Sequence, residues 1–148
     1  MRVLLQRVSR ASVRVRGDVV ASIGPGLLLL VGVGRDDGFG EYDRLAEKVF
    51  HLRVFEDDDG KMNRSLSDVG GEILLVPQFT LFGDVRKGRR PSWDGAAPPE
   101  VAADRVEAFA RALESRGATV KRGAFREHME VELVNDGPVT IWIDAKDL

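Results

Sequence analysis

The stretch Leu27-Leu28-Leu29-Leu30-Val31-Gly32-Val33 decides the fold of this chain. It begins with the longest apolar run in the sequence, Leu27 to Val31, and shows no alternation between apolar and polar residues. A strand with one face in water alternates, whereas a strand covered on both faces is apolar throughout. The run is far too short to span a bilayer. We therefore predict that residues 27–33 form the central strand of a sheet.

Further strands are predicted on the N-terminal side of this stretch. Residues 2–8 and 12–16 have strand character, and Gly17-Asp18 turns the chain into a third strand at residues 19–23. Gly24-Pro25-Gly26 then separates this meander from the central strand.

The C-terminal side adds two helices and more strands. One helix begins at Glu41, and a second begins near Pro98-Pro99 and ends at Gly117. Their apolar stripes are Tyr42, Leu45, Ala46 and Val49, and Ala102, Val106, Phe109, Ala110 and Leu113. Strand-like segments are 52–55, 73–76, 129–133 and 139–143, and 83–99 form a long loop. We predict a single α+β domain over residues 1–148, with mostly antiparallel strands forming a barrel-like sheet system and two main helices packed on it.

Composition excludes several classes of protein and site. The chain has no Cys, which excludes a disulfide scaffold, a thiol nucleophile and a Cys-ligated metal. The N-terminal apolar run breaks too early for a signal peptide, so we expect a soluble, cytoplasmic protein with no membrane contact. The formal net charge of −2 means that any contact with nucleic acid must be a local patch.

Familiar cofactor and catalytic motifs are absent. Gly32-Val33-Gly34 followed by Gly38 misses the dinucleotide-binding spacing by one residue. The acidic run at residues 57–60 lacks the first and last ligands of a calcium loop, so we interpret it as a solvated turn. The two histidines, His51 and His128, have no partner in the sequence, and we treat them as packing or surface residues. We expect neither a metal nor a cofactor.

Two segments in the middle of the chain carry candidate site residues. Pro77-Gln78-Phe79-Thr80 ends an apolar strand, where Gln78 and Thr80 can donate hydrogen bonds and backbone N–H groups can form an oxyanion hole. The same pattern fits an ordinary strand end with Phe79 in the core. Arg86, Lys87, Arg89 and Arg90 then precede Trp93 in the long loop. Arginine binds phosphate and tryptophan stacks on unpaired bases, although a basic loop is also typical of plain solvated surface.

Gly137-Pro138 lies between two strand-like segments. Asn135-Asp136-Gly137 supplies turn chemistry, while Pro138 fixes φ and leaves the preceding bond able to be cis. Local sequence favours an ordinary turn with Pro138 opening an edge strand. The alternative is a rigid surface of backbone carbonyls that binds a ligand.

Taken together, segments spread over the whole chain resemble the D-aminoacyl-tRNA deacylases, in the same order and with no large insertion. They are Leu4-Leu5-Gln6-Arg7-Val8, Phe55-Glu56-Asp57 through Gly60-Lys61-Met62-Asn63, Gln78-Phe79-Thr80-Leu81, Arg86-Lys87-Gly88-Arg89-Arg90-Pro91-Ser92, Ala96-Ala97-Pro98-Pro99 and Asn135-Asp136-Gly137-Pro138-Val139-Thr140.

The resemblance implies hydrolysis of the ester that joins a D-amino acid, or glycine mischarged on tRNA(Ala), to the 3′ end of tRNA. It also implies a homodimer with the active site at the interface, and a proofreading activity that rejects L-aminoacyl-tRNA as a substrate. A cis Gly137-Pro138 would enter the partner's pocket, close to the catalytic Gln78 and Thr80. The implied substrate-binding residues are Pro77, Phe79, Gly137, Pro138, Arg7 and Met129, and the implied tRNA-binding residues are Arg86, Lys87, Arg89 and Arg90.

One departure from the family pattern leaves alternatives open. The family usually has Ser where this chain has Pro77, which removes a hydroxyl and a backbone N–H. Because Gln78, Phe79, Thr80, Gly137 and Pro138 are all in place, we predict an active deacylase. The alternative is a non-catalytic tRNA-binding module that lost turnover through Pro77. A third reading is a related editing deacylase with a trans Gly137-Pro138 bond.

Overall fold

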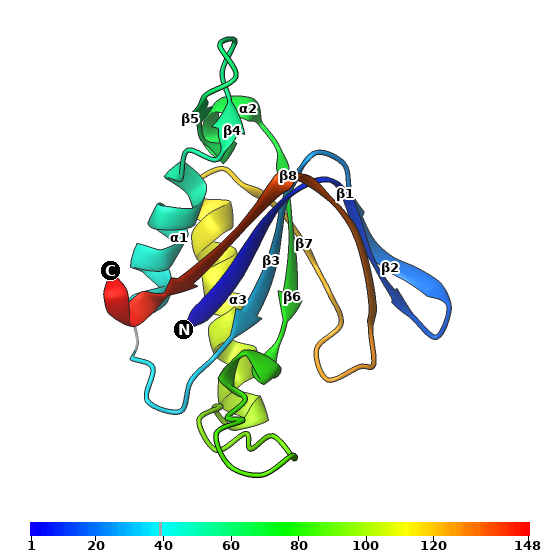
Figure 1. Ribbon diagram of the computed structural model, residues 1–148, viewed down its shortest axis with the longest axis vertical. Coiled ribbons are helices and arrows are strands. Elements are labelled where there is room, and N and C mark those ends of the chain that lie inside the picture. The colour runs from blue at the N-terminus through cyan, green and yellow to red at the C-terminus, as the bar shows by residue number, and fades with distance from the viewer. Residues whose placement is uncertain (39) are drawn as a thin grey trace.

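The central strand predicted from the leucine run is present as β3 (Gly26–Gly32), with six of its seven residues buried. It lies in the six-stranded sheet of a computed structural model that describes residues 1–38 and 40–148 (Figure 1). On one side β3 pairs antiparallel with β1 (Arg2–Val15), and on the other it pairs parallel with β6 (Glu72–Pro77).

The rest of the sheet is built outward from these three strands. β2 (Asp18–Ile23) and β8 (Glu130–Asp144) both pair antiparallel with β1, and β7 (Thr119–Arg122) pairs parallel with β6. The N-terminal half of β1 lies between β3 and β8, and its C-terminal half lies between β2 and β8. Because β1 changes partners along its length, the sheet curls, and the predicted α+β class with a barrel-like sheet is confirmed.

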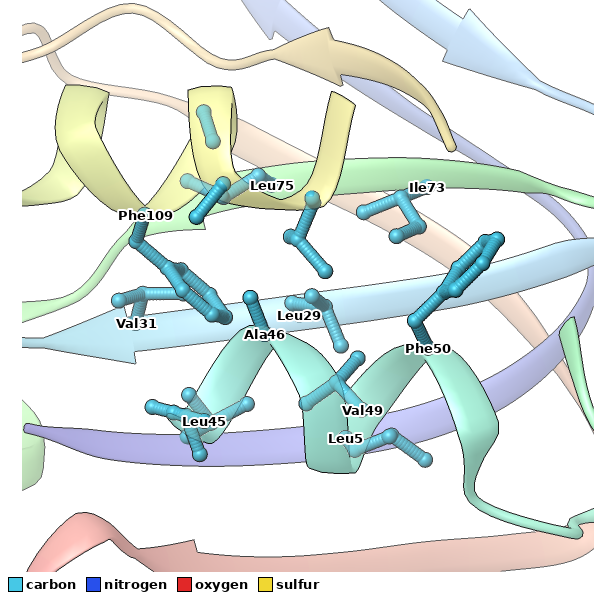
Figure 2. Close-up of a cluster of buried hydrophobic side chains, with 14 of the residues drawn as sticks. Leu5, Leu29, Val31, Leu45, Ala46, Val49, Phe50, Ile73, Leu75 and Phe109 are labelled. Carbon is cyan, nitrogen blue, oxygen red and sulfur yellow. The ribbon is translucent and has the colours of Figure 1, made fainter. Parts of the chain in front are cut away.

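Two long helices cover one face of the sheet, as predicted. α1 (Glu41–His51) and α3 (Pro99–Ser115) lie beside each other on that face (Figure 1). Figure 2 shows Leu45 and Val49 of α1 and Phe109 of α3 gathered over Leu29 and Val31 of β3. A second apolar cluster, which includes Leu28 and Leu74, lies on the opposite face under the curl of the sheet. The central strand is apolar throughout because both of its faces are covered.

Shorter elements complete the chain. They are β4 (Phe55–Glu56), β5 (Met62–Arg64), α2 (Leu66–Val69) and the 3₁₀ turns η1 (Phe79–Phe82) and η2 (Ala145–Asp147). Of the predicted strand at 52–55 only Phe55 lies in a strand, β4. The acidic run 57–60 turns the chain between β4 and β5, as interpreted. No helix in the described part of the chain is long and apolar enough to cross a membrane.

Two predicted strand breaks are wrong. The predicted strands at 2–8 and 12–16 form one strand, β1, which ends at Val15. The segments 129–133 and 139–143 are joined in the single 15-residue strand β8, which begins at Glu130. The chain does not reverse at Gly137-Pro138, because both halves of β8 pair with β1. Asn135 pairs with Val8 and Thr140 pairs with Gln6, so the residues between them oppose Arg7 alone. The predicted turn is therefore a bulge within a strand.

Candidate functional site

Pro77 ends the pairing between β6 and β7 and so opens a cavity. The N–H of Gln78 donates to the carbonyl of Val31 in β3 at 2.7 Å. Successive amides of a strand point to opposite sides, so the nitrogen of Pro77 faces β7. The last bond on that side runs from the Gly123 N–H to the Leu75 carbonyl at 2.8 Å. Because proline has no N–H to continue this ladder, the two chains separate at Pro77.

A cavity of about 620 Å³ lies at this separation. Pro77, Gln78 and Phe79 form one wall, and Met129 lies in another, in the segment that leads into β8. The third wall is the segment from Trp93 to Pro99 and the start of α3. The structure thus brings together four of the residues predicted to bind substrate or to catalyse. His128 also lines this cavity, a position that its isolation in the sequence did not indicate.

Gln78, which lines the cavity, forms a pair with Thr80. The side-chain amide of Gln78 donates a hydrogen bond to the hydroxyl oxygen of Thr80. Thr80 is exposed and lies in η1, outside the cavity lining. The interpretation of this segment as an ordinary strand end with Phe79 in the core is wrong, because the chain coils into η1 after β6 and leaves Phe79 56% exposed.

The η1 turn is fastened to the first residue of β1. The Arg2 guanidinium donates to the Leu81 carbonyl at 3.0 Å and to Asp144 at 3.1 Å, and it stacks 4.3 Å from the centroid of the Phe82 ring. Burial raises the pKa of Asp144, but hydrogen bonds from the Lys146 N–H and from Arg2 outweigh this effect and bring the pKa below its usual value. Arg2 was not among the predicted site residues, because an arginine that begins a strand carries no local signal.

The Gly137-Pro138 bulge is held from two sides. Its peptide bond is cis, which differs from the trans bond of the editing alternative. Arg7 is buried and donates to the carbonyls of Asp136 and Val54, each at 2.7 Å. Asn135 closes the bulge from within, since its amide oxygen accepts from the Val139 N–H at 2.8 Å and its amide nitrogen donates to the Val139 carbonyl at 3.1 Å.

Within one chain the bulge and the cavity are separate. Gly137 and Pro138 are exposed and line no part of the cavity. In Figure 1 β8 bends over in the upper half of the molecule, below β4 and β5, and the segment that follows β6 lies near the bottom. The predicted site residues thus form two groups. Arg7, Gly137 and Pro138 lie at the bulge, and Pro77, Gln78, Phe79 and Met129 lie at the cavity.

The basic loop lies in the sequence between Phe79 and Trp93, which both line the cavity. Arg86, Lys87, Arg89 and Arg90 are all exposed. Arg86 donates to both carboxylate oxygens of Asp84, and these hydrogen bonds, together with one from the Arg86 N–H, lower the pKa of Asp84 to about 2.

Comparison with known proteins supports one family. The family model for D-Tyr-tRNA(Tyr) deacylase matches residues 4–144. The chain belongs to the D-Tyr-tRNA(Tyr) deacylase family. A D-aminoacyl-tRNA deacylase of Thermomicrobium roseum is 61% identical over 148 residues, which are all of this chain and 96% of the relative. A D-aminoacyl-tRNA deacylase of Heliobacterium modesticaldum is 56% identical, with 99% of this chain and 97% of the relative covered.

A solved structure has the same fold as this chain. The structure described as the c-Myc DNA unwinding element binding protein superposes with a TM-score of 0.91 at 40% identity, covering 97% of this chain and 98% of that one. Membership of the D-Tyr-tRNA(Tyr) deacylase family confirms the resemblance drawn from the sequence segments.

Proposed function

We propose that this chain hydrolyses the ester bond of D-aminoacyl-tRNA and releases the free D-amino acid and tRNA. The observation that carries the proposal is the cavity of about 620 Å³ lined by Pro77, Gln78 and Phe79 in a chain of this family. An aminoacyl ester is already activated, so fixed dipoles and correct positioning supply much of the required lowering of the barrier. Such a site needs neither a thiol nor a paired histidine.

Gln78 and Thr80 act in this proposal as orienting and hydrogen-bonding groups. The Thr80 oxygen accepts a hydrogen bond from the Gln78 amide, and an amide N–H cannot remove the hydroxyl proton. Thr80 is therefore a poor nucleophile, and its proton is free to donate to the substrate. The first N–H groups of η1 have no partner within a 3₁₀ turn, and they serve as donors to the developing oxyanion.

The selection against L-aminoacyl-tRNA is proposed to come from a second copy of the chain. Gly137 and Pro138 are exposed and lie away from the cavity of their own chain, so they can reach a cavity only across a dimer interface. There their carbonyls would bind the substrate ammonium and leave no space for an L side chain. Arg7 braces the bulge and Met129 lies on the cavity wall. Glycine has no side chain to exclude, so glycyl-tRNA mischarged on tRNA(Ala) would also be a substrate.

The decisive experiment follows the decay of D-tyrosyl-tRNA and L-tyrosyl-tRNA with the purified protein. We expect rapid loss of the D ester only, and a fall of about 10²–10³-fold in kcat for Gln78→Ala if the amide helps to stabilise the transition state. Decay of both esters at the rate of buffer alone would leave the non-catalytic tRNA-binding alternative. In that case Pro77→Ser should restore turnover if Pro77 is its cause.

The cross-subunit arrangement has a separate test, because two inactive variants can complement each other. A heterodimer of Gln78→Ala with Pro138→Ala contains one complete site if the Gly-Pro bulge acts on the partner, and none if it acts within its own chain. Random exchange of subunits should then restore roughly a quarter of the wild-type sites, since half of the dimers are mixed. No recovery after confirmed exchange would refute the cross-subunit site.

A further inference from the structure

Two exposed aromatic side chains meet at the rim of the cavity. The rings of Phe79 and Trp93 make an edge-to-face contact, with centroids 5.3 Å apart and planes at 76°. Phe79 is 56% exposed and Trp93 is 40% exposed, and both line the cavity. Aromatic side chains of this size are usually covered, so an exposed pair beside a cavity indicates a binding surface.

The indole of Trp93 is held in place by its surroundings. A Cβ on Gly83 would lie 2.8 Å from Cζ3 of Trp93, so the ring lies directly against the Gly83 backbone. Asp84 and Ser92 exchange two backbone hydrogen bonds of 2.8 and 2.9 Å, which close the loop between them. Gly83 and Trp93 flank this closed loop, so the ring position is fixed relative to the loop.

The tip of the same loop carries the positive charge. Arg86 is paired with Asp84 at 2.6 Å. Within residues 1–38 and 40–148, no carboxylate lies within 4.0 Å of the charged groups of Lys87, Arg89 or Arg90. A positive loop next to an exposed aromatic pair is the combination that binds single-stranded nucleic acid, because phosphates meet the cations and bases stack on the rings.

We propose that Trp93, supported by Phe79, is a stacking platform for the unpaired base that precedes the terminal adenosine of the tRNA. The inference rests on the proposed function, because the ester in the cavity fixes where the next nucleotide leaves it. That nucleotide passes the cavity rim, where Trp93 lies. A paired base is already stacked on its neighbours, so only the single-stranded end of the acceptor can use the platform.

The test compares two substrates that differ only in the nucleotides before the adenosine. For D-tyrosyl-tRNA, Trp93→Ala should raise KM by about 5- to 150-fold, the range expected for one stacked base. For 2′(3′)-O-D-tyrosyl-adenosine, which lacks those nucleotides, KM should change less than twofold. Trp93→Phe should retain most of the affinity, and Gly83→Ala should reproduce the loss by displacing the indole. Val85→Ala, which removes another exposed side chain from the loop, is the matched control.

An equal rise in KM for both substrates would overturn the inference, because Trp93 would then only shape the cavity. If the wild type hydrolyses neither substrate, the proposed function fails, and binding tests the platform separately. In Trp142→Phe, Trp93 is the single tryptophan. Its fluorescence should be quenched by an RNA hairpin with an unpaired 3′ C-C-A end. Equal quenching by a blunt hairpin would also overturn the inference.

Discussion

Replacing Arg7 with alanine should destabilise the protein and disrupt the Gly-Pro bulge. The Arg7 side chain is 6% exposed and donates one hydrogen bond to the Asp136 carbonyl in the bulge and one to the Val54 carbonyl. Glu56 and Asp136 contribute little as ion-pair partners, because their carboxylates lie 3.6 and 3.8 Å away and are more than half exposed. A hydrogen bond from a charged donor contributes about 1.5–3 kcal/mol, so loss of both predicts about 3–6 kcal/mol.

The measurement is thermal unfolding of Arg7→Ala beside the wild type. For a domain of this length, about 3–6 kcal/mol corresponds to a fall in Tm of roughly 6–24 °C. Arg10→Ala is the matched control, since Arg10 lies on the same strand, is 66% exposed and is 3.9 Å from Glu132. It should lose less than about 1 kcal/mol. Deacylation of D-tyrosyl-tRNA, measured where both variants are folded, should fall only in Arg7→Ala. Equal losses of stability in the two variants would refute the bracing role of Arg7.

Three further outcomes are expected. Arg2→Met should lower kcat by about tenfold with little change in overall fold, because methionine keeps an apolar side chain but loses the hydrogen bond to the Leu81 carbonyl and the stack on Phe82. An unchanged kcat would show that η1 does not need this support. The pKa of Asp84 is depressed to about 2, so its pairing with Arg86 is intact above the unfolded pKa of about 3.9 and is lost as pH falls toward 2. The fluorescence of Trp93, measured in Trp142→Phe, should change between these two pH values, and Asp84→Asn should remove this change. Gly26→Ala should lower the free energy of unfolding by about 3 kcal/mol or more, because the new Cβ would lie 1.9 Å from the Glu72 carbonyl oxygen and the paired backbone cannot shift without strain. A wild-type Tm by calorimetry would contradict this.

The layered part of the fold could be predicted because each layer leaves a periodic signal. β3 is apolar on both faces, and α1 and α3 show apolar stripes at helical spacing, so local sequence identified all three. The sequence at η1 wrongly favours a strand end, because Phe79 and Leu81 alternate with polar residues as they would in a strand. The exposure of Phe79 arises from the 3₁₀ coil after Pro77, which periodicity does not encode.

The site could be predicted only in part, since its main supports join residues far apart in the chain. Asn135 to Pro138 have the composition of a turn, and only the pairing of both halves of β8 with β1 makes them a bulge. The partners of Arg7, in the bulge and before β4, are likewise set by tertiary structure. The family resemblance indicates a supporting role for Arg7, although no local pattern does. Neither the resemblance nor a local pattern indicates Arg2.

The two arginines of β1 provide an independent reason to expect a site shared between two chains. Arg2 holds η1, and Arg7 holds the Gly-Pro bulge. They are five residues apart on one strand, which places them about 17 Å apart at the rise of an extended chain, with side chains on opposite faces. η1 and the bulge of one chain are thus anchored on opposite faces of the same strand, too far apart to contact the two sides of one aminoacyl ester. A rigid strand cannot close this gap by bending. The separation therefore supports the proposal that Gly137 and Pro138 act on a substrate held by Gln78 of another copy, which the complementation of inactive variants would test.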